Sequence, residues 1–248
     1  MPKVALAIPC YVAATRPSDG RAAAAVLRAL GDEVSVLDGR CCGQPAFTSG
    51  FREESRRVGT ELLRAAQPFD AIVMPSSSCV SMVHHYLAPM FEGTRRTGAE
   101  RIGERFHEFA SYVAGHPAID SLPLRLPGTV AYHDACHARR ELRITGDVLG
   151  VLARVDGLEV RRLEFEGECC GFGGVFSAKL PEVSAGMRQA KLDDVRATGA
   201  QVVVSTDLSC LGHLEAGAIA GGQPLETWTL AELLSRALQP STGEAEDA

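Results

Sequence analysis

The sequence predicts an α/β fold with two pseudo-symmetric, doubly wound units, mainly parallel sheets and cysteines at the carboxyl ends of strands. Short apolar runs alternate with longer stretches of mixed polarity, which is typical of parallel strands covered by helices on both faces. A Cys-Cys-Gly triplet occurs twice, at Cys41-Cys42-Gly43 and at Cys169-Cys170-Gly171. Each triplet lies between two single cysteines at similar distances. We therefore expect a duplicated unit built around thiols.

The expected strands are short runs rich in Val, Ile and Ala, too short for buried helices. They lie at 3–9, 33–38, 70–75, 129–134, 158–165 and 200–206. The expected helices are longer and carry charged residues between apolar ones. They lie at 18–30, 51–67, 80–91, 98–114, 138–154, 181–198, 211–220 and 229–238. The run at Val4–Ile8 is expected to be a strand and not a leader, because a similar run before a cysteine returns at Thr129–Cys136.

The cysteine frame establishes the repeat. Its spacings are C-x30-CCG-x35-C and C-x32-CCG-x38-C, and the offsets between equivalent cysteines are 126, 128 and 131 residues. A slowly growing offset indicates a duplication with small loop insertions. The segment 115–128, with three prolines and two glycines, is the expected boundary. The expected domains are 1–120 and 121–240, each with one CCG motif, and 241–248 is expected to be a frayed, disordered tail.

Composition excludes several classes of protein. The net charge is −6 and the sequence pI about 5.7, so a nucleic-acid footprint of clustered Lys and Arg is not expected. No stretch approaches the ~20 apolar residues of a membrane span. No Walker A motif or strand-linked G-x-G-x-x-G is present, so no nucleotide cofactor is expected. Without a leader the protein is expected to be cytoplasmic, where thiols stay reduced.

All eight cysteines fall into the two frames, which indicates metal or redox chemistry. Four thiolates per half match the requirement of an iron–sulfur cluster or a Cys₄ zinc site. Zinc sites usually contain C-x₂₋₄-C pairs, and this chain has none, so a cluster is favoured and zinc in one half is the alternative. Structural buried cysteines and disulfides are less favoured. The expected ligands are Cys10, Cys41, Cys42, Cys79, Cys136, Cys169, Cys170 and Cys210.

Four residues near the cysteines have competing interpretations: Met82, His133, His137 and His213. Met82 and His213 each lie three residues after the last cysteine of a frame. Met82 is expected in the core, whereas His213 is either a nitrogen ligand or an ordinary helix residue. His133 and His137 flank Cys136 and can donate hydrogen bonds to cluster sulfurs, relay protons or play structural roles.

The motifs resemble those of the lactate utilisation protein A family over nearly the whole chain. The segments that carry the resemblance are GRCCGQPAFTSG (39–50), PSSSCVSM (75–82), YHDACHARR (132–140), CCGFGGVFSAK (169–179) and ETWTLAELL (226–234). The same duplicated cysteine-rich CCG domain occurs in the cysteine-rich subunit of heterodisulfide reductase and in the glycolate oxidase iron–sulfur subunit. Repeats of the heterodisulfide reductase type end in C-x-x-C, and here Met82 and His213 replace that last cysteine.

The resemblance implies an iron–sulfur electron-transfer subunit of a complex that oxidises L-lactate to pyruvate, without independent activity. It implies two partner subunits, one of them containing iron–sulfur centres. The eight cysteines carry over as ligands of one or two clusters of the [4Fe-4S] type. The alternatives are a subunit of a glycolate or other 2-hydroxyacid oxidase, a thiol/disulfide redox enzyme like heterodisulfide reductase, and a zinc-bound scaffold.

Overall fold

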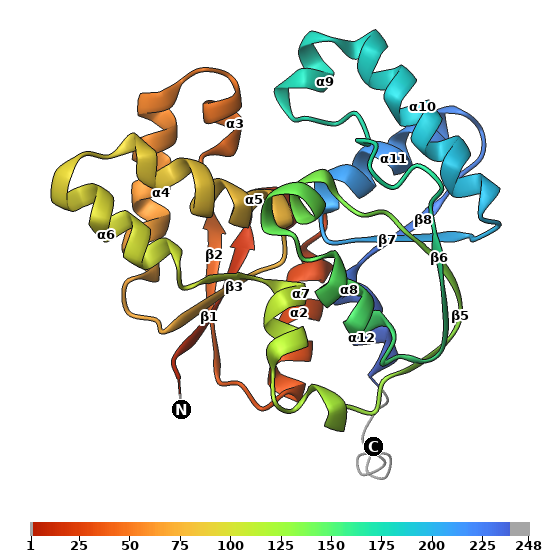
Figure 1. Ribbon diagram of the computed structural model, residues 1–248, viewed down its shortest axis with the longest axis horizontal. Helices are drawn as coiled ribbons and strands as arrows, with labels where there is room; N and C mark the ends of the chain where they lie inside the picture. Colours follow the sequence, from red (N-terminus) through yellow and green to blue (C-terminus); the bar gives the residue numbers. More distant parts are fainter. Residues whose placement is uncertain (1, 239–248) are drawn as a thin grey trace.

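The computed structural model describes residues 2–238, apart from the side chains at positions 38 and 39. Its described strands form two four-stranded sheets with the orders β2-β1-β3-β4 and β6-β5-β7-β8 (Figure 1). All strand pairs in both sheets are parallel, which confirms the predicted fold class. The expected tail at 241–248 lies outside the described residues. The strands are β1 Val4–Pro9, β2 Val34–Arg40, β3 Ala71–Met74, β4 Phe106–Glu108, β5 Arg125–Tyr132, β6 Asp156–Arg162, β7 Val202–Ser205 and β8 Glu226–Thr229.

Helices connect successive strands. The α-helices are α1 Cys10–Thr15, α2 Pro17–Ala29, α3 Gln44–Thr48, α4 Arg52–Ala66, α5 Ser77–Ser81, α6 Gly93–Gly103, α7 Phe109–Gly115, α8 Thr145–Leu152, α9 Val175–Lys179, α10 Pro181–Ala197, α11 Leu208–Ala220 and α12 Leu230–Ala237. Two segments are π-helical, η1 Met82–Leu87 and η4 His137–Leu142. Two short 3₁₀ turns complete the helical elements, η2 Ala88–Met90 and η3 Ile119–Ser121.

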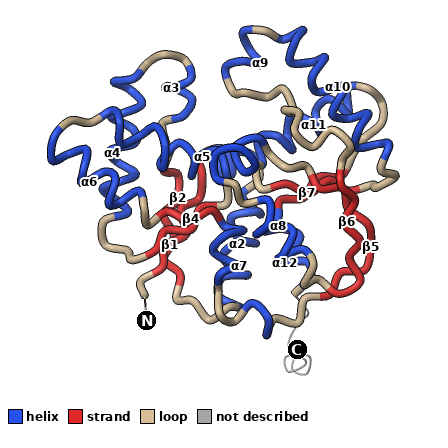
Figure 2. The backbone as a smooth tube through the Cα atoms, in the orientation of Figure 1, coloured by secondary structure: helices blue, strands red, loops and turns tan. Residues whose placement is uncertain are grey.

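The two sheets share a central layer of helices. Helices α2, α7, α8 and α12 lie between the sheets (Figures 1 and 2). Alternate residues of a strand face opposite sides, so Leu6 and Tyr132 pack into this shared layer. Their neighbours Ala5 and Ala131 face the outer helices of their own repeats. At these positions the central strands β1 and β5 are therefore buried on both faces, as predicted, whereas the edge strand β6 is largely exposed.

The last helix of each repeat packs against the other repeat. Helix α7 ends the first repeat and packs against α8 of the second, whereas α12 ends the second repeat and packs against α2 of the first. One apolar core consequently contains residues from both repeats. This packing of each terminal helix on the other repeat brings the carboxyl ends of the two sheets together and so positions the site. The division of the chain at residue 120 stays a prediction.

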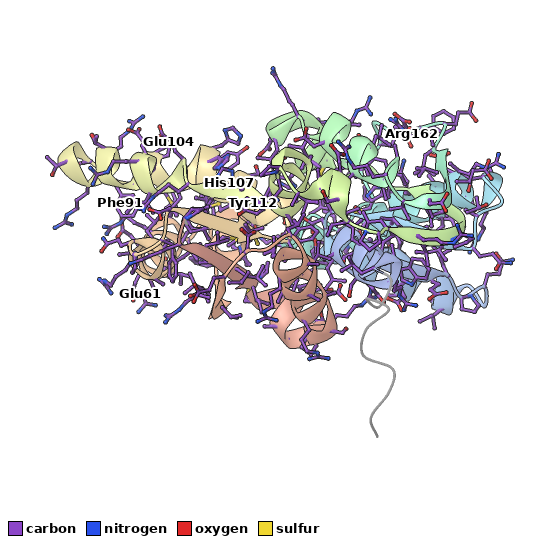
Figure 3. All side chains as sticks on the ribbon, turned by 90° about the horizontal axis from the view of Figure 1, so that it is seen from below. Glu61, Phe91, Glu104, His107, Tyr112 and Arg162 are labelled. Atoms are coloured by element: carbon purple, nitrogen blue, oxygen red, sulfur yellow. The ribbon has the colours of Figure 1, made fainter. Side chains whose placement is uncertain are left out.

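Two of the sequence expectations were wrong about secondary structure. The helix expected at 98–114 is interrupted by the three-residue strand β4, in which Phe106 pairs with Ile72. His107 follows Phe106 and lies beside Tyr112 of α7, with ring centroids 5.9 Å apart (Figure 3). The helix expected at 138–154 is divided into η4 and α8, because Arg143 adopts a left-handed conformation with φ 57°. A strand of three residues and a single left-handed residue leave almost no trace in hydrophobic periodicity.

Candidate metal centre

All eight cysteines line one cavity of about 560 Å³, and all are free thiols. They reach it from both repeats: Cys10, Cys41, Cys42 and Cys79 from the first, and Cys136, Cys169, Cys170 and Cys210 from the second. Helices α3 and α9, which follow the two triplets, contribute Thr48 and Val175 to the lining. The two sets of four thiols expected from sequence are therefore brought together at a single place.

The sheet topology explains how each set converges. In the first repeat, Cys10 follows β1 directly, the triplet follows β2, and Cys79 lies on α5 after β3. These three strands are neighbours in one parallel sheet, so their carboxyl ends meet at one edge. The second repeat places Cys136 and Cys210 in the same way after β5 and β7.

Each Cys-Cys-Gly triplet is held by a serine of the second helix after it. Ser55 Oγ of α4 donates a hydrogen bond to the Gly43 carbonyl at 2.9 Å, and Ser184 Oγ of α10 donates one to the Gly171 carbonyl at 2.7 Å. Gly43 and Gly171 have φ of +89° and +86°. A Cβ at either glycine would lie 2.7 Å from the carbonyl oxygen of that serine, so the triplet approaches the helix as closely as glycine allows.

Thiol hydrogen bonds leave one favoured thiolate in each set. The pKa of Cys41 lies well below its usual value because the thiols of Cys10 and Cys42 donate to its sulfur. The Gly43 N–H donates to the same sulfur at 3.4 Å. The pKa of Cys10 is raised because its thiol donates to Cys41 and is partly buried. Binding of a soft metal would displace the remaining thiol protons.

The second set has the same pattern around Cys169. The pKa of the Cys169 thiol is lowered because Cys136 and Cys170 donate to it, and Gly171 N–H lies at 3.4 Å from the sulfur. The pKa of Cys136 and that of Cys170 are raised, first by these hydrogen bonds and then by burial. Both repeats therefore present a thiolate, further ionisable thiols and a backbone donor to the cavity.

A buried carboxylate ties the two sets together. Asp207 is 2% exposed, and its Oδ2 accepts from Ser78 N–H of the first repeat at 2.8 Å. Its Oδ1 accepts from Ser209 N–H at 3.2 Å and so caps α11. Ser78 directly precedes Cys79 and Ser209 directly precedes Cys210, so one side chain fixes both cysteine-bearing helix ends. Sequence reasoning missed this role, although an Asp before a helix is a typical N-cap signal.

The three histidines near the second set, His133, His137 and His213, lie in different environments. His133 is 1% exposed, and its ligand atom lies within 4.8 Å of the sulfurs of Cys170 and Cys210, which lie within that distance of each other. Burial lowers the pKa of His133 to about 4, so the ring is neutral. His137 Nδ1 lies 3.6 Å from Cys136 Sγ. His213 is not part of the His133 group, and its Nε2 lies 3.2 Å from Ser184 Oγ. Met82 is fully buried in the core of the first repeat, as predicted.

The donor set fits a thiolate-bound metal centre. Thiolates are soft ligands suited to iron–sulfur clusters, zinc or copper(I). Four converge in each repeat, and a neutral buried imidazole adjoins the second set. The site is therefore a cysteine cluster capable of binding metal.

Within residues 2–238, no helix is both long and apolar enough to cross a bilayer.

Both repeats match a known family of cysteine-rich domains. The family model of the CCG cysteine-rich domain matches residues 4–84 and 130–215. Lactate utilization protein A 1 of Bacillus anthracis is 30% identical over 239 residues, which cover 95% of this chain and 99% of that protein. Lactate utilization protein A of an Exiguobacterium species is 34% identical over 244 residues, covering 96% and 99% of the two chains.

A solved structure shares the fold alone. The crystal structure of a hypothetical protein from Helicobacter pylori superposes with a TM-score of 0.62 at 10% sequence identity. The match covers 98% of this chain and 51% of that one. The sequence matches, by contrast, are long and cover both repeats. The chain belongs to the lactate utilization protein A family and contains two CCG cysteine-rich domains.

Proposed function

We propose that the protein is the iron–sulfur electron-transfer subunit of a complex that oxidises L-lactate to pyruvate. The observation that carries the proposal is that two equivalent sets of four thiols line the same cavity. Four thiolates are the usual ligand set of an iron–sulfur cluster, and a bound cluster supplies one-electron transfer. The names of the relatives supply lactate as the substrate of the system.

The chain's own residues bind and orient the clusters. The eight cysteines are the proposed ligands, with one or two [4Fe-4S] clusters per chain. Ser55 and Ser184 hold the two triplets against their helices, and Asp207 fixes the helix ends that carry Cys79 and Cys210. Cys42 and Cys170 are buried, which restricts water at the inner side of each set. Burial and hydrogen bonds to sulfur are what tune the potential of such centres.

The proposal assigns the substrate chemistry to partner subunits. Removal of two electrons and two protons converts lactate to pyruvate, and a cluster accepts one electron at a time. Among the described residues that line the cavity, none is an arginine or lysine that would bind a carboxylate. We therefore place lactate binding on one of two partners and electron passage on this chain, in a reducing, cytoplasmic compartment.

A second candidate is supported by the size of the cavity. About 560 Å³ lies within the range of small-molecule sites, about 300–1,000 Å³. A disulfide or hydroxyacid could bind directly beside a cluster there, which would make the protein an enzyme in its own right. A change in the cluster spectrum on addition of such a compound would favour this candidate over electron transfer alone.

Cysteine replacement tests the proposal. We expect Cys169→Ser to lose the iron of the second set and Cys41→Ser that of the first, because each removes the central thiolate of its set. Thr48→Ala is the matched control, since Thr48 lines the same cavity without a thiol. Iron and sulfide are measured per chain in anaerobically purified protein. Full iron content in both serine variants would contradict the assignment.

A further inference from the structure

We propose that His133 is a metal ligand of the second-repeat centre, a nitrogen donor without a counterpart at the equivalent position of the first repeat. The inference rests on the proposed function, since it assumes a metal centre at the cysteines. It concerns a residue outside the cysteine frame.

The ring of His133 is buried without a hydrogen-bond partner. Its exposed fraction is 1%, and neither Nδ1 nor Nε2 has a partner among the described residues. An unpaired buried polar group destabilises the fold, so native structures rarely leave one without a role. A metal ion bound to one ring nitrogen would remove this cost. Imidazole is a common ligand of both zinc and iron.

The surroundings of His133 are those of a ligand. Its ligand atom and the sulfurs of Cys170 and Cys210 all lie within 4.8 Å of one another, and all three residues are buried. Three donors of two chemical kinds therefore converge on one point. Nε2 of His213, another histidine near this set, lies 3.2 Å from Ser184 Oγ instead.

The fold fixes the position of His133. Its backbone N–H donates to the Val204 carbonyl at 2.9 Å, which extends the β5–β7 pairing by one residue. Alternation along the strand puts its side chain on the same face as Ala131. The ring is therefore held at the carboxyl end of a central strand, where the cysteines of this repeat gather.

The equivalent position of the first repeat offers no such donor. Leu6 pairs with Val73 as Tyr132 pairs with Val204, so Ala7 is the equivalent of His133. Both lie three residues before the first cysteine of their frame. Ala7 is fully buried in the apolar core and offers no ligand atom. Among the described residues, the first repeat contains no group like that of His133, Cys170 and Cys210.

The asymmetry would set the direction of electron flow. A neutral imidazole adds no negative charge to the centre, and histidine ligation raises the potential of iron–sulfur centres. With a cluster bound in each repeat, the second-repeat centre would be the stronger electron acceptor, and an electron would pass from the first centre to the second.

Pulsed EPR on protein containing ¹⁵N-labelled histidine tests the proposal. We expect a directly bonded ¹⁵N coupling in the reduced wild type and in His213→Ala, and its loss in His133→Ala. The reduction potential of one centre should also fall in His133→Ala, a variant that places at this position the alanine found at Ala7 in the first repeat. His137→Ala is a second control, because His137 lies beside Cys136.

The outcomes separate the two proposals. A wild type with iron but without bonded ¹⁵N coupling, or with a coupling that persists in His133→Ala, overturns the ligand role. The first of these two criteria uses the wild type alone and stands even if the variant does not fold. If the protein binds no iron, the proposed function fails, and added Co²⁺ then tests His133 alone. In that case we expect His133→Ala to bind Co²⁺ at least about tenfold more weakly, and equal binding would overturn the role.

Discussion

The close approach of the first triplet to helix α4 predicts opposite behaviour for two similar glycines. Gly43 and Gly50 have φ of +89° and +90°, so alanine is strained at both. A Cβ at Gly43 would lie 2.7 Å from the Ser55 carbonyl oxygen, whereas a Cβ at Gly50 would meet nothing within 4 Å. Gly50→Ala is therefore a matched control that isolates the effect of the close contact.

The expected magnitudes follow from these two contributions. The left-handed backbone costs alanine about 1–2 kcal/mol at either position. The overpacking against backbone atoms adds about 1–3 kcal/mol at Gly43 alone. The free energy of unfolding should consequently fall by about 1–2 kcal/mol in Gly50→Ala and by about 2–5 kcal/mol in Gly43→Ala. Relief of the contact requires movement of the triplet, so Gly43→Ala should also bind less metal.

Chemical denaturation and metal analysis of the two variants measure these effects. We expect Gly50→Ala to retain the wild-type metal content and Gly43→Ala to lose the metal of the first repeat. If the two variants were equally stable and equally loaded with metal, the close contact would not hold the triplet in place.

Two further predictions concern buried carboxylates. Asp207→Ala should lower the free energy of unfolding by about 2–4 kcal/mol, because Ser78 N–H is left unpaired and α11 loses its cap. The control is Asp193→Ala, at an exposed position. If Asp207→Ala destabilised the protein no more than this control, the bridging role would be refuted. Burial raises the pKa of Glu108 to about 8, so the folded protein keeps a proton that the unfolded chain releases above about 4.5. The free energy of unfolding should therefore fall as the pH rises from about 4.5 to about 8, and this fall should be smaller in Glu108→Gln. Parallel pH profiles of stability for the wild type and Glu108→Gln would contradict this.

Much of the site could be predicted from sequence because it depends on topology. Cys10 and Cys136 follow apolar runs that read as strands, and parallel strands bring their carboxyl ends to one edge. The glycine after each cysteine pair indicated a turn, and Gly43 and Gly171 do have positive φ. The repeat itself follows from the two similar cysteine frames and needed no structure. These features are local in sequence or are repeated, so one chain displays them.

Other features depend on contacts between distant segments. Strand β4 is three residues long and gains its identity only by pairing with β3. The packing of α12 on α2 links residues about 200 positions apart and has no local signal. Asp207 bridges to Ser78 across 129 positions. By its spacing His213 was a candidate nitrogen ligand, whereas the structure groups His133 with the cysteines.

Iron, sulfide and zinc per chain, measured on protein purified without oxygen, test the central claim most directly. The account predicts about four irons with matching sulfide for one cluster, or about eight for one in each repeat. EPR of the reduced protein should then show the cluster signals. Zinc without iron in such a preparation would contradict the account, because the cysteine frames would then be structural and electron transfer would belong to the partner subunits.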